Sequence, residues 1–350
     1  MNVDFLIVGQ GIAGSLLGWF LKEAGQKVAF IDNFNKGAAS SVAAGIINPV
    51  TGRRFVKSWM IDELMPKALA TYRQLEETAN TQFLFRRNIL WALSDNQQQN
   101  DWYARATDPG YEKFIVPEPD ASALRDFCQE PFCWVELKGA LNVNLKAVVD
   151  FIRFAFAGQG LHYNEPFYYD HLNIDNQSVK YKSITSKKII FCEGHQSAIN
   201  PFFKELPYQP AKGEVILVNI PGFKIDKMIK SGVFLVPQGN YHFWVGSSYV
   251  WKFLNDQPTS EGRNWLIKKL KEVLNCPFEI IKHKAAIRPV FKDRRPVIGF
   301  SQAYPQIGIF NGLGTKGASL GPFWAKHFSD FLTGKIPGLN SEVNVQRFNN

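Results

Sequence analysis

The sequence predicts an α/β fold built from two packed parts. Near the N-terminus, a buried strand, a glycine-rich turn, a helix and a second strand follow one another in the order of a parallel βαβ unit. Later in the chain, the segment 232–251 has the pattern of an antiparallel hairpin. The chain has 350 residues, more than one hydrophobic core usually holds. A parallel sheet accompanied by a second, mostly antiparallel sheet accounts for all three observations.

Composition and charge exclude several classes of protein. Apolar residues make up 45% of the chain and charged residues 20%, so a folded globular protein is expected rather than a disordered one. The formal net charge is +9, in short clusters such as Arg294-Arg295. A solvated basic surface explains these clusters, and an anionic partner such as RNA is the alternative. No apolar run reaches the roughly 18 residues of a membrane span, and no signal peptide is evident, so a cytoplasmic location is expected.

The cysteines and histidines do not form a metal site. The four cysteines contain no CxxC pair, and reduced, packed thiols are expected of them. A disulfide between Cys128 and Cys133 is the alternative in an oxidising compartment. The six histidines show no metal-binding spacing. No bound metal is therefore predicted.

The βαβ unit at the N-terminus predicts a dinucleotide site of the Rossmann type. The apolar run DFLIVG leads into Gly9, Gly11 and Gly14, which satisfy G-x-G-x-x-G, and a helical pattern then ends at Gly25. The glycines permit a tight turn, a close approach of a pyrophosphate, and close packing of helix on strand. The next strand, KVAFID, ends in Asp32, whose carboxylate suits ribose hydroxyls. This segment alone leaves NAD and FAD open.

The segment that follows, residues 35–49, is rich in small residues and is expected to be neither helix nor strand. Ser40 and Ser41 are candidate donors to phosphate or ribitol oxygens, and Gly45 lets the backbone lie against a flat group. A flexible linker is the alternative. Its ending in the apolar turn GIINPV favours a structured role.

These motifs, with others later in the chain, resemble the FAD-dependent D-amino-acid oxidase family, which includes glycine oxidase. The shared stretches are AASSVAAGIINP, IIFCEGH, PAKGEVILV, IRPVFKDRRPVIG and NGLGTKGASLGP, in the order of the family, and the resemblance spans about residues 3–333. The stretch GLGTKG also resembles the FAD domain of the bifunctional bacterial tRNA wobble-uridine enzyme. The resemblance is weak between the motifs, notably over 85–135.

The resemblance implies FAD as the cofactor and a Rossmann-like FAD-binding domain interleaved with an α+β substrate domain on a mostly antiparallel sheet. The first is expected over 1–60, 138–215 and 286–350, and the second over 61–137 and 216–285. The residues expected to contact FAD are Gly9, Gly11, Ile12, Ala13, Gly14, Asp32, Ser40, Ser41, Gly45, Ile46, Phe167, Gly194, His195, Arg288, Gly312, Leu313, Gly314, Thr315, Lys316 and Gly317. Lys316 is expected near the pyrimidine edge of the flavin, with a solvated cation as the alternative.

In this family the arginine that opens the RPxxxDxxPxIG motif binds the substrate carboxylate, and Arg288 matches it. A guanidinium meets a carboxylate with two parallel hydrogen bonds. A pairing with a structural acid is the alternative. The sequence departs from the family at Phe234, where amino-acid oxidases of this type place a tyrosine hydroxyl. Tyr249 or Tyr241 is the candidate replacement, and Arg53 with its neighbour is a candidate additional anion contact.

The expected activity is FAD-dependent oxidation of the C–N bond of an amino acid or N-substituted glycine, with hydride transfer to flavin N5 and hydrolysis of the imine. Arg288 is expected to orient the substrate. The alternative is oxidative removal of a carboxymethyl group from a modified tRNA wobble uridine, favoured by GLGTKG and the net charge of +9. A flavin-binding protein without catalysis is a third interpretation. The sequence leaves the electron acceptor, any covalent flavin attachment and the oligomeric state open.

Overall fold

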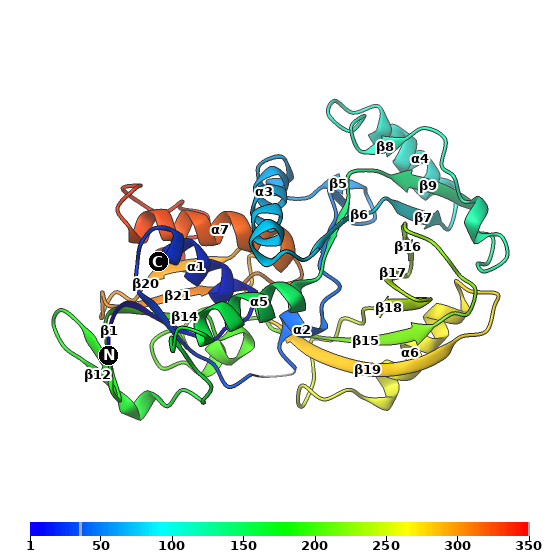
Figure 1. Cartoon of the computed structure of the whole chain (residues 1–350). Helices are drawn as coiled ribbons and strands as arrows, with labels where there is room; N and C mark the ends of the chain where they lie inside the picture. Colours follow the sequence, from blue (N-terminus) through cyan, green and yellow to red (C-terminus); the bar gives the residue numbers. More distant parts are fainter. Residues whose placement is uncertain (35–36, 349–350) are drawn as a thin grey trace.

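The computed structural model of the protein describes residues 1–34 and 37–348. Two large sheets lie side by side (Figure 1), with both chain termini beside the first sheet. Residues 35–36, which open the predicted small-residue segment, and 349–350, which close the predicted FAD-binding domain, lie outside the described residues.

The first sheet has a parallel centre, as predicted. Its strands are β1 (Asn2–Val8), β2 (Val28–Ile31), β11 (His162–Tyr163), β12 (Leu172–Ile174), β13 (Val179–Tyr181), β14 (Ile184–Phe191), β20 (Val297–Phe300) and β21 (Ile307–Asn311). The order is β11-β2-β1-β14-β13-β12, with β21 beside β14 and β20 beside β21. β1 pairs in parallel with β2 and β14, and β14 pairs in parallel with β21. Leu6 and Ile7 of β1 are fully buried, because helices or loops cover both faces of the sheet.

Four helices pack on one another beside this sheet: α1 (Ile12–Glu23), α3 (Ile61–Ala79), α5 (Leu145–Ala157) and α7 (Gly317–Leu332). α1 ends as predicted at Gly25, which has φ +78° and whose N–H donates to the Lys22 carbonyl at 2.9 Å. α1 contacts α5 and α7. α3, which lies in the range predicted for the substrate domain, packs against α7 (Figure 1).

The second sheet is mostly antiparallel, as predicted. Its strands are β7 (Ile89–Leu93), β8 (Ile115–Val116), β9 (Cys133–Leu137), β15 (Ala211–Asn219), β16 (Met228–Ser231), β17 (Val233–Gly239), β18 (His242–Gly246) and β19 (Glu279–Arg288). The order is β19-β15-β18-β17-β16-β7-β9-β8, and the β16–β7 pair is parallel. The β17–β18 hairpin turns after Gly239, where a positive φ of +84° suits glycine.

Helix α6 (Ser260–Lys271) packs on this sheet. The N-cap residue is Thr259, whose hydroxyl accepts from the Gly262 N–H at 3.1 Å. Ser260 is the first helical residue. Both residues are good caps, and the choice between them depends on where the chain leaves the loop.

Smaller elements connect these layers. They are α2 (Ala39–Val42), α4 (Asn96–Ala106), β3 (Ile46–Ile47), β4 (Val50–Thr51), β5 (Val56–Lys57), β6 (Leu84–Arg86), β10 (Leu141–Val143), and the 3-10 turns η1 (Ser122–Leu124), η2 (Tyr169–His171), η3 (Gly194–Ile199) and η4 (Val345–Phe348). α2 and β3 correct the expectation that residues 35–49 contain neither helix nor strand. Cys128 and Cys133 are free thiols rather than a disulfide. Within the described residues, none of the helices combines the length and apolar character needed to cross a membrane.

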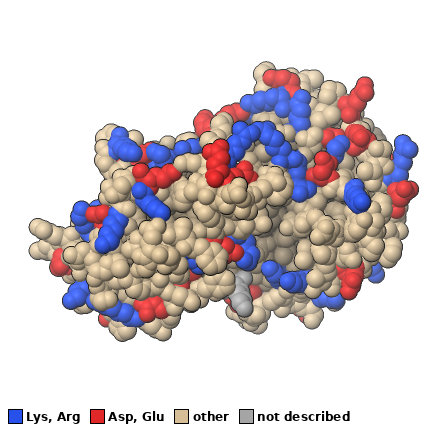
Figure 2. All heavy atoms as spheres, viewed as in Figure 1, with Lys and Arg blue, Asp and Glu red and all other residues tan. Residues whose placement is uncertain are grey.

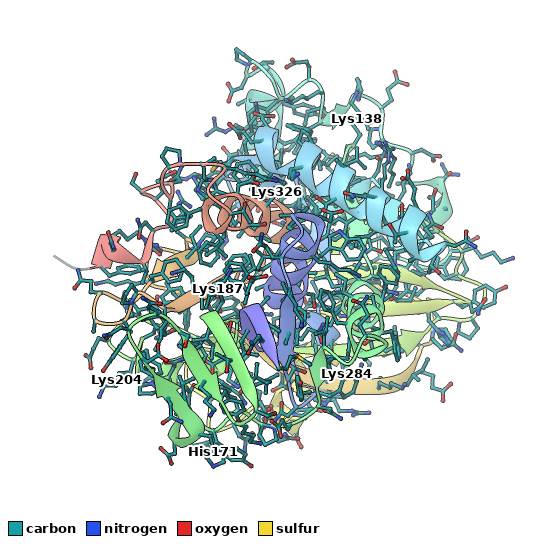
Figure 3. All side chains as sticks on the ribbon, turned by 60° about the vertical axis from the view of Figure 1, so that its left-hand side comes forward. Lys138, His171, Lys187, Lys204, Lys284 and Lys326 are labelled. Atoms are coloured by element: carbon teal, nitrogen blue, oxygen red, sulfur yellow. The ribbon has the colours of Figure 1, made fainter. Side chains whose placement is uncertain are left out.

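Charges of both signs share the surface. On the face in Figure 2, Lys and Arg side chains are interspersed with Asp and Glu. In Figure 3, Lys187, Lys204 and Lys284 lie apart from one another on different parts of the fold. Lys187 is paired with Asp4 at 2.7 Å. These faces fit the solvated basic surface expected from the sequence.

Candidate active site

A cavity of about 690 Å³ lies between the two sheets. On one side its lining includes residues at the carboxyl ends of β1, β2, β14 and β21. On the other side it includes one face of β15, β16, β17, β18 and β19. The carboxyl edge of a parallel sheet is the usual ligand site of an α/β fold. The cavity therefore joins a nucleotide-type site to a wall of the second sheet.

The turn between β1 and α1 is shaped by its glycines. Gly9 has φ +92°, and a Cβ there would lie 2.5 Å from the carbonyl oxygen of Cys192. A Cβ at Gly14 would lie 2.1 Å from the Gly9 carbonyl oxygen, so Gly14 is needed for close packing of helix and strand. Gly11 lines the cavity, and a Cβ there would meet Ser40 Oγ at 3.4 Å. The backbone of Gly11 is thus open to a ligand, as its motif position predicts.

Ser40 completes the start of α1. Its Oγ accepts a hydrogen bond of 2.9 Å from the Ile12 N–H. Ser40 thus supplies the capping acceptor that Gly11, the N-cap residue, cannot supply because it has no side chain. The sequence predicted Ser40 as a donor to phosphate. Its hydroxyl proton is still available for that bond while the oxygen accepts from Ile12. Ser41, the other predicted donor, is not among the lining residues.

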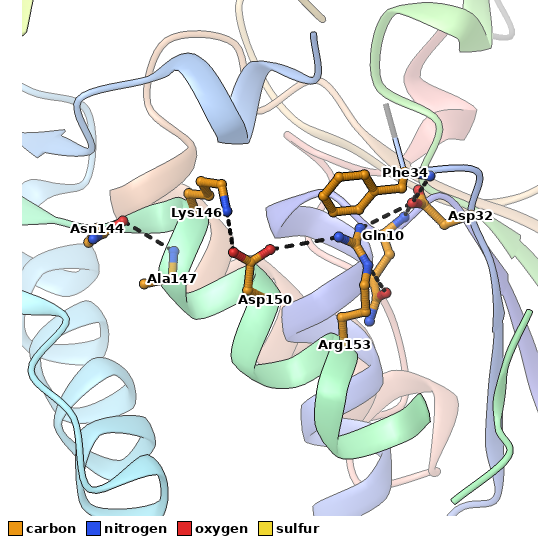
Figure 4. A network of polar contacts seen from close by, with 8 residues as sticks. All are labelled: Gln10, Asp32, Phe34, Asn144, Lys146, Ala147, Asp150 and Arg153. Carbon is orange, nitrogen blue, oxygen red and sulfur yellow. Dashed lines mark hydrogen bonds and ion pairs between the residues drawn. The ribbon is translucent and has the colours of Figure 1, made fainter. Parts of the chain in front are cut away.

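Asp32 belongs to a network of polar contacts at the carboxyl end of β2 (Figure 4). Its carboxylate accepts from the Gln10 N–H at 2.7 Å and from the Phe34 N–H at 2.9 Å. Arg153 of α5 donates to it at 3.1 Å and also to the side chain of Gln10. Sequence reasoning missed Arg153, because α5 is more than a hundred residues from Asp32 in the chain. The network holds the carboxylate at the cavity wall, where spare lone pairs can accept from hydroxyl groups.

Glu193 is half-buried directly after β14 and lines the cavity. Tyr169 donates to it at 2.6 Å and Asn200 at 2.7 Å. Burial raises the pKa of Glu193 to about 7. Phe167, predicted beside the adenine, stacks on Tyr181 with ring centroids 4.4 Å apart and lines the cavity. This end of the cavity is lined by aromatic rings, which suits a purine.

The loop after β21 carries the predicted GLGTKG contacts. The Asn311 side chain donates to the Gly194 carbonyl at 2.7 Å and so joins this loop to the end of β14. Gly314 donates to the Pro289 carbonyl at 3.0 Å, which fixes the loop directly beside Arg288. Lys316 immediately precedes α7 and lines the cavity. Burial, with a smaller contribution from Arg295, lowers the pKa of Lys316 below its usual range.

Arg288, the last residue of β19, points into the cavity across β15. Its guanidinium lies over Gly213, where a Cβ would be only 1.9 Å from one of its nitrogens. It donates to Ser247 Oγ at 2.5 Å and to the Ser248 carbonyl at 3.2 Å. The other terminal nitrogen, Nη1, is buried without a hydrogen-bond partner. None of the described carboxylates forms an ion pair with Arg288, so the alternative of a structural acid is not observed.

The two tyrosines proposed as replacements for the missing hydroxyl lie in different places. The ring of Tyr249 covers the Arg288 guanidinium at 5.0 Å, although Tyr249 is not among the lining residues. Tyr241 lies in the β17–β18 turn and directly precedes β18. Arg288 contacts Ser247, which directly follows the opposite end of β18. The structure does not bring Tyr241 to the cavity, because the hairpin register points the turn away. Phe234 does line it, so the wall has no hydroxyl at that position.

Most of the predicted site residues line this one cavity. Those that do are Gly9, Gly11, Ile12, Ala13, Asp32, Ser40, Gly45, Ile46, Phe167, Gly194, His195, Arg288, Leu313, Gly314, Thr315, Lys316 and Gly317. Gly14 and Gly312 pack behind it, and a Cβ at Gly312 would meet the Phe291 ring at 2.6 Å. Arg53 and Arg54 are exposed on a turn and do not line it. No group of side chains suited to a metal ion occurs in the described chain.

Sequence reasoning missed three residues of the substrate side. Gly213 was visible as a glycine inside an apolar strand run, a pattern that marks a close approach. Ser247 and Lys230 gave no local signal, because only the register of the second sheet places them at the cavity.

Comparison with known proteins decides the family. Residues 4–331 match the model of the DAO family, described as FAD dependent oxidoreductase. The chain belongs to this family. It is 27% identical to glycine oxidase of Pseudomonas putida over 138 residues, which is 38% of this chain and 37% of that protein. The match thus spans little more than a third of that relative.

Solved structures of other members share the fold over nearly the whole chain. Glycine oxidase from Geobacillus kaustophilus aligns with a TM-score of 0.80 at 19% identity, covering 96% of both chains. Iminodiacetate oxidase from Chelativorans sp. BNC1 aligns with a TM-score of 0.78 at 18% identity, covering 97% of this chain and 98% of that one. At such identity the likeness establishes the fold.

The cavity fits the FAD on which this family depends. The open backbone of Gly11 and the N-terminus of α1 suit a pyrophosphate. The Asp32 carboxylate at the cavity wall suits ribose hydroxyls, and the Phe167 side of the cavity suits an adenine. At the other end, Lys316 and the N-terminus of the 16-residue helix α7 offer positive charge where a reduced flavin carries negative charge.

Proposed function

We propose that this member of the family oxidises the C–N bond of an amino acid or an N-substituted glycine. The observation that carries the proposal is Nη1 of Arg288, a buried donor beside the cavity without a partner. An unpaired buried donor on a cation is costly, and a carboxylate would satisfy it with a charge-assisted hydrogen bond. The substrate therefore carries a carboxylate that docks on Arg288.

The charges of the lining favour a neutral substrate amine. The carboxylates Asp32, Glu165 and Glu193 lie on the nucleotide side of the cavity. The wall around Arg288 presents a second cation, Lys230, and no acid among its described residues. An ammonium group would be repelled there, whereas a neutral amine keeps the lone pair that forms the C=N bond as hydride leaves Cα.

Bound FAD supplies the hydride acceptor. The work of this chain is then to hold the substrate Cα in a reactive position and to exclude water. Arg288 is held by Ser247 and Ser248 and lies flat on Gly213, so it is oriented before the substrate arrives. Phe234 and Trp244 make the neighbouring wall apolar.

The missing hydroxyl at Phe234 disfavours glycine itself. Glycine has no group to contact an aromatic wall, and it loses one donor, which is worth about 1 kcal/mol for an ordinary hydrogen bond. A substituent on nitrogen or Cα would gain apolar contact with Phe234 instead. One structural neighbour is an iminodiacetate oxidase, which supports an N-substituted glycine as the substrate class.

The test is anaerobic reduction of the purified holoprotein, followed by its visible spectrum. We expect the oxidised flavin band to bleach with an N-substituted glycine or an amino acid, and a free amine to appear after imine hydrolysis. Arg288→Leu should lower kcat/KM at least about 100-fold, since it removes two charge-assisted hydrogen bonds. Arg73→Leu, an exposed position on α3, is the control and should retain activity.

Two outcomes would contradict the proposal. Equal bleaching by wild type and Arg288→Leu would show that no carboxylate docks at Arg288. Bleaching by carboxymethylaminomethyl-modified tRNA and by none of glycine, sarcosine, proline or D-alanine would favour the tRNA alternative instead.

A further inference from the structure

Lys230 is a second cation on the substrate side of the cavity, and the function proposed above assigns it no group of the substrate to bind. It lies on β16 and lines the cavity beside Phe234. Its register partners are Phe234 of β17 and Trp91 of β7. Residues directly opposite each other on paired strands point to the same face, here toward the cavity. Nζ lies 3.2 Å from the centroid of the Trp91 ring and 5.4 Å from that of Phe234.

No carboxylate among the described residues pairs with Lys230, unlike other shielded lysines of the same sheet. Lys212 lies 3.4 Å from Glu214, and Lys227 lies 2.9 Å from Glu136. Burial lowers the pKa of Lys230 to about 7. The indole face of Trp91 is its main stabilising partner, and such a contact is weaker than a buried ion pair. The Lys230 ammonium therefore lies at the cavity and can still bind an anion.

The sheet register sets how far Lys230 lies from Ser247, the residue that holds the Arg288 guanidinium. Lys230 is opposite Phe234, Phe234 is opposite Gly246, and Ser247, which follows Gly246, holds the Arg288 guanidinium. The strands of Lys230 and Gly246 are two spacings apart, roughly 10 Å. Phe234 lies between them and offers an apolar surface. This arrangement suits an extended molecule with an anion at each end.

We propose that Lys230 binds a second carboxylate of the substrate, remote from the one at Arg288. This inference rests on the proposed function and deepens it: the substrate class becomes N-substituted glycines or amino acids whose substituent ends in a carboxylate. The amine and Cα lie near Arg288, the methylene groups pass Phe234, and the terminal carboxylate draws Nζ from the Trp91 face. A monocarboxylate leaves Lys230 without its anion.

The experiment compares two probes that differ in one group. N-(3-carboxypropyl)glycine carries the second carboxylate, and its terminal amide is nearly the same size without the charge. We expect wild type to prefer the carboxylate in kcat/KM by roughly 30-fold, as for one charge-assisted hydrogen bond. Lys230→Met should abolish this preference and leave the amide within about threefold of wild type. Lys230→Arg should retain the preference, and Lys180→Met, exposed on β13, is the matched control.

A binding readout separates this inference from the proposed function. In 4-[(carboxymethyl)thio]butanoate, sulfur replaces the amine, so it binds without being oxidised in this way. Its dissociation constant, from perturbation of the flavin spectrum, should rise in both Lys230→Met and Arg288→Leu. A rise in Arg288→Leu alone would overturn the role of Lys230 and keep the proposed function. No rise in either variant would overturn both.

Kinetics provide a further refutation. If Lys230→Met lowers kcat/KM equally for the carboxylate and the amide, Lys230 supports the fold or the chemistry rather than specificity. If wild type does not distinguish the two probes, the second carboxylate has no binding site at Lys230.

Discussion

Gly213→Ala tests the position of the Arg288 guanidinium without changing Arg288 itself. The new methyl group would lie 1.9 Å from one terminal nitrogen and 2.3 Å from the central carbon of the guanidinium. These atoms are at the flexible end of a long side chain, so the side chain can move while the strand stays in place. Gly213 is not at a positive φ, and alanine there carries no backbone strain.

The magnitude follows from the bonds that a displaced guanidinium loses. A hydrogen bond to a charged group contributes about 1.5–3 kcal/mol. Loss of one such bond, about 2 kcal/mol, lowers kcat/KM roughly 30-fold, and loss of both lowers it roughly 1000-fold. Thermal stability should not fall in parallel, because alanine in a strand is favoured over glycine by about 0.5–1 kcal/mol.

The assay is anaerobic flavin reduction with the best amino substrate, paired with a thermal melt. Gly338→Ala is the control, because nothing lies within 4 Å of a Cβ at that position and its φ is not positive. Unchanged kcat/KM in Gly213→Ala would refute the reasoning that the carboxylate site depends on this close contact. A lower melting temperature together with lost flavin would show that Gly213 matters for folding instead.

Three other predictions follow from contacts around the cavity. Burial raises the pKa of Glu193 to about 7, above its unfolded value. The protonated Glu193 therefore contributes fully to the stability of the apoprotein below about pH 4.5, and this contribution is lost as the pH rises through 7. Glu193→Gln should flatten that fall in thermal melts between pH 5 and 8, and an unchanged slope would contradict the assignment. Ser40→Ala removes the bond to Ile12 and should cost about 1 kcal/mol in denaturant unfolding and weaken FAD binding; unchanged values of both would contradict its capping role. Tyr249→Phe keeps the ring over Arg288 and should match wild type, whereas Tyr249→Ala should lower kcat/KM roughly threefold; a large loss in the Phe variant would mean that the hydroxyl acts.

The cavity contains the predicted residues where the site is local in the chain. Gly9, Gly11 and Asp32 lie within one βαβ unit, and strand, turn and helix preferences define their geometry without distant contacts. Arg288 was identified because it stands at a fixed place in a motif, and the cavity position agrees with it.

The substrate side of the cavity was harder to predict, because the strand register of the second sheet, rather than a local motif, brings its residues to the cavity. Lys230, Gly213 and Ser247 come together only after β15, β16 and β18 take their places in the second sheet. A shift of one residue in any of these strands would turn the side chain to the opposite face.

The hydrogen bond from Gly314 to the Pro289 carbonyl limits which part of the cavity can change shape between related enzymes. Arg288 is next in sequence to Pro289, so this bond ties the proposed carboxylate anchor directly to the loop predicted at the flavin edge. Lys230 reaches this anchor only through four strand-to-strand steps of the sheet. Changes in sheet curvature between related enzymes would therefore alter the room at the Lys230 end while the reacting end keeps its spacing, so that substrate length can diverge without loss of the chemistry.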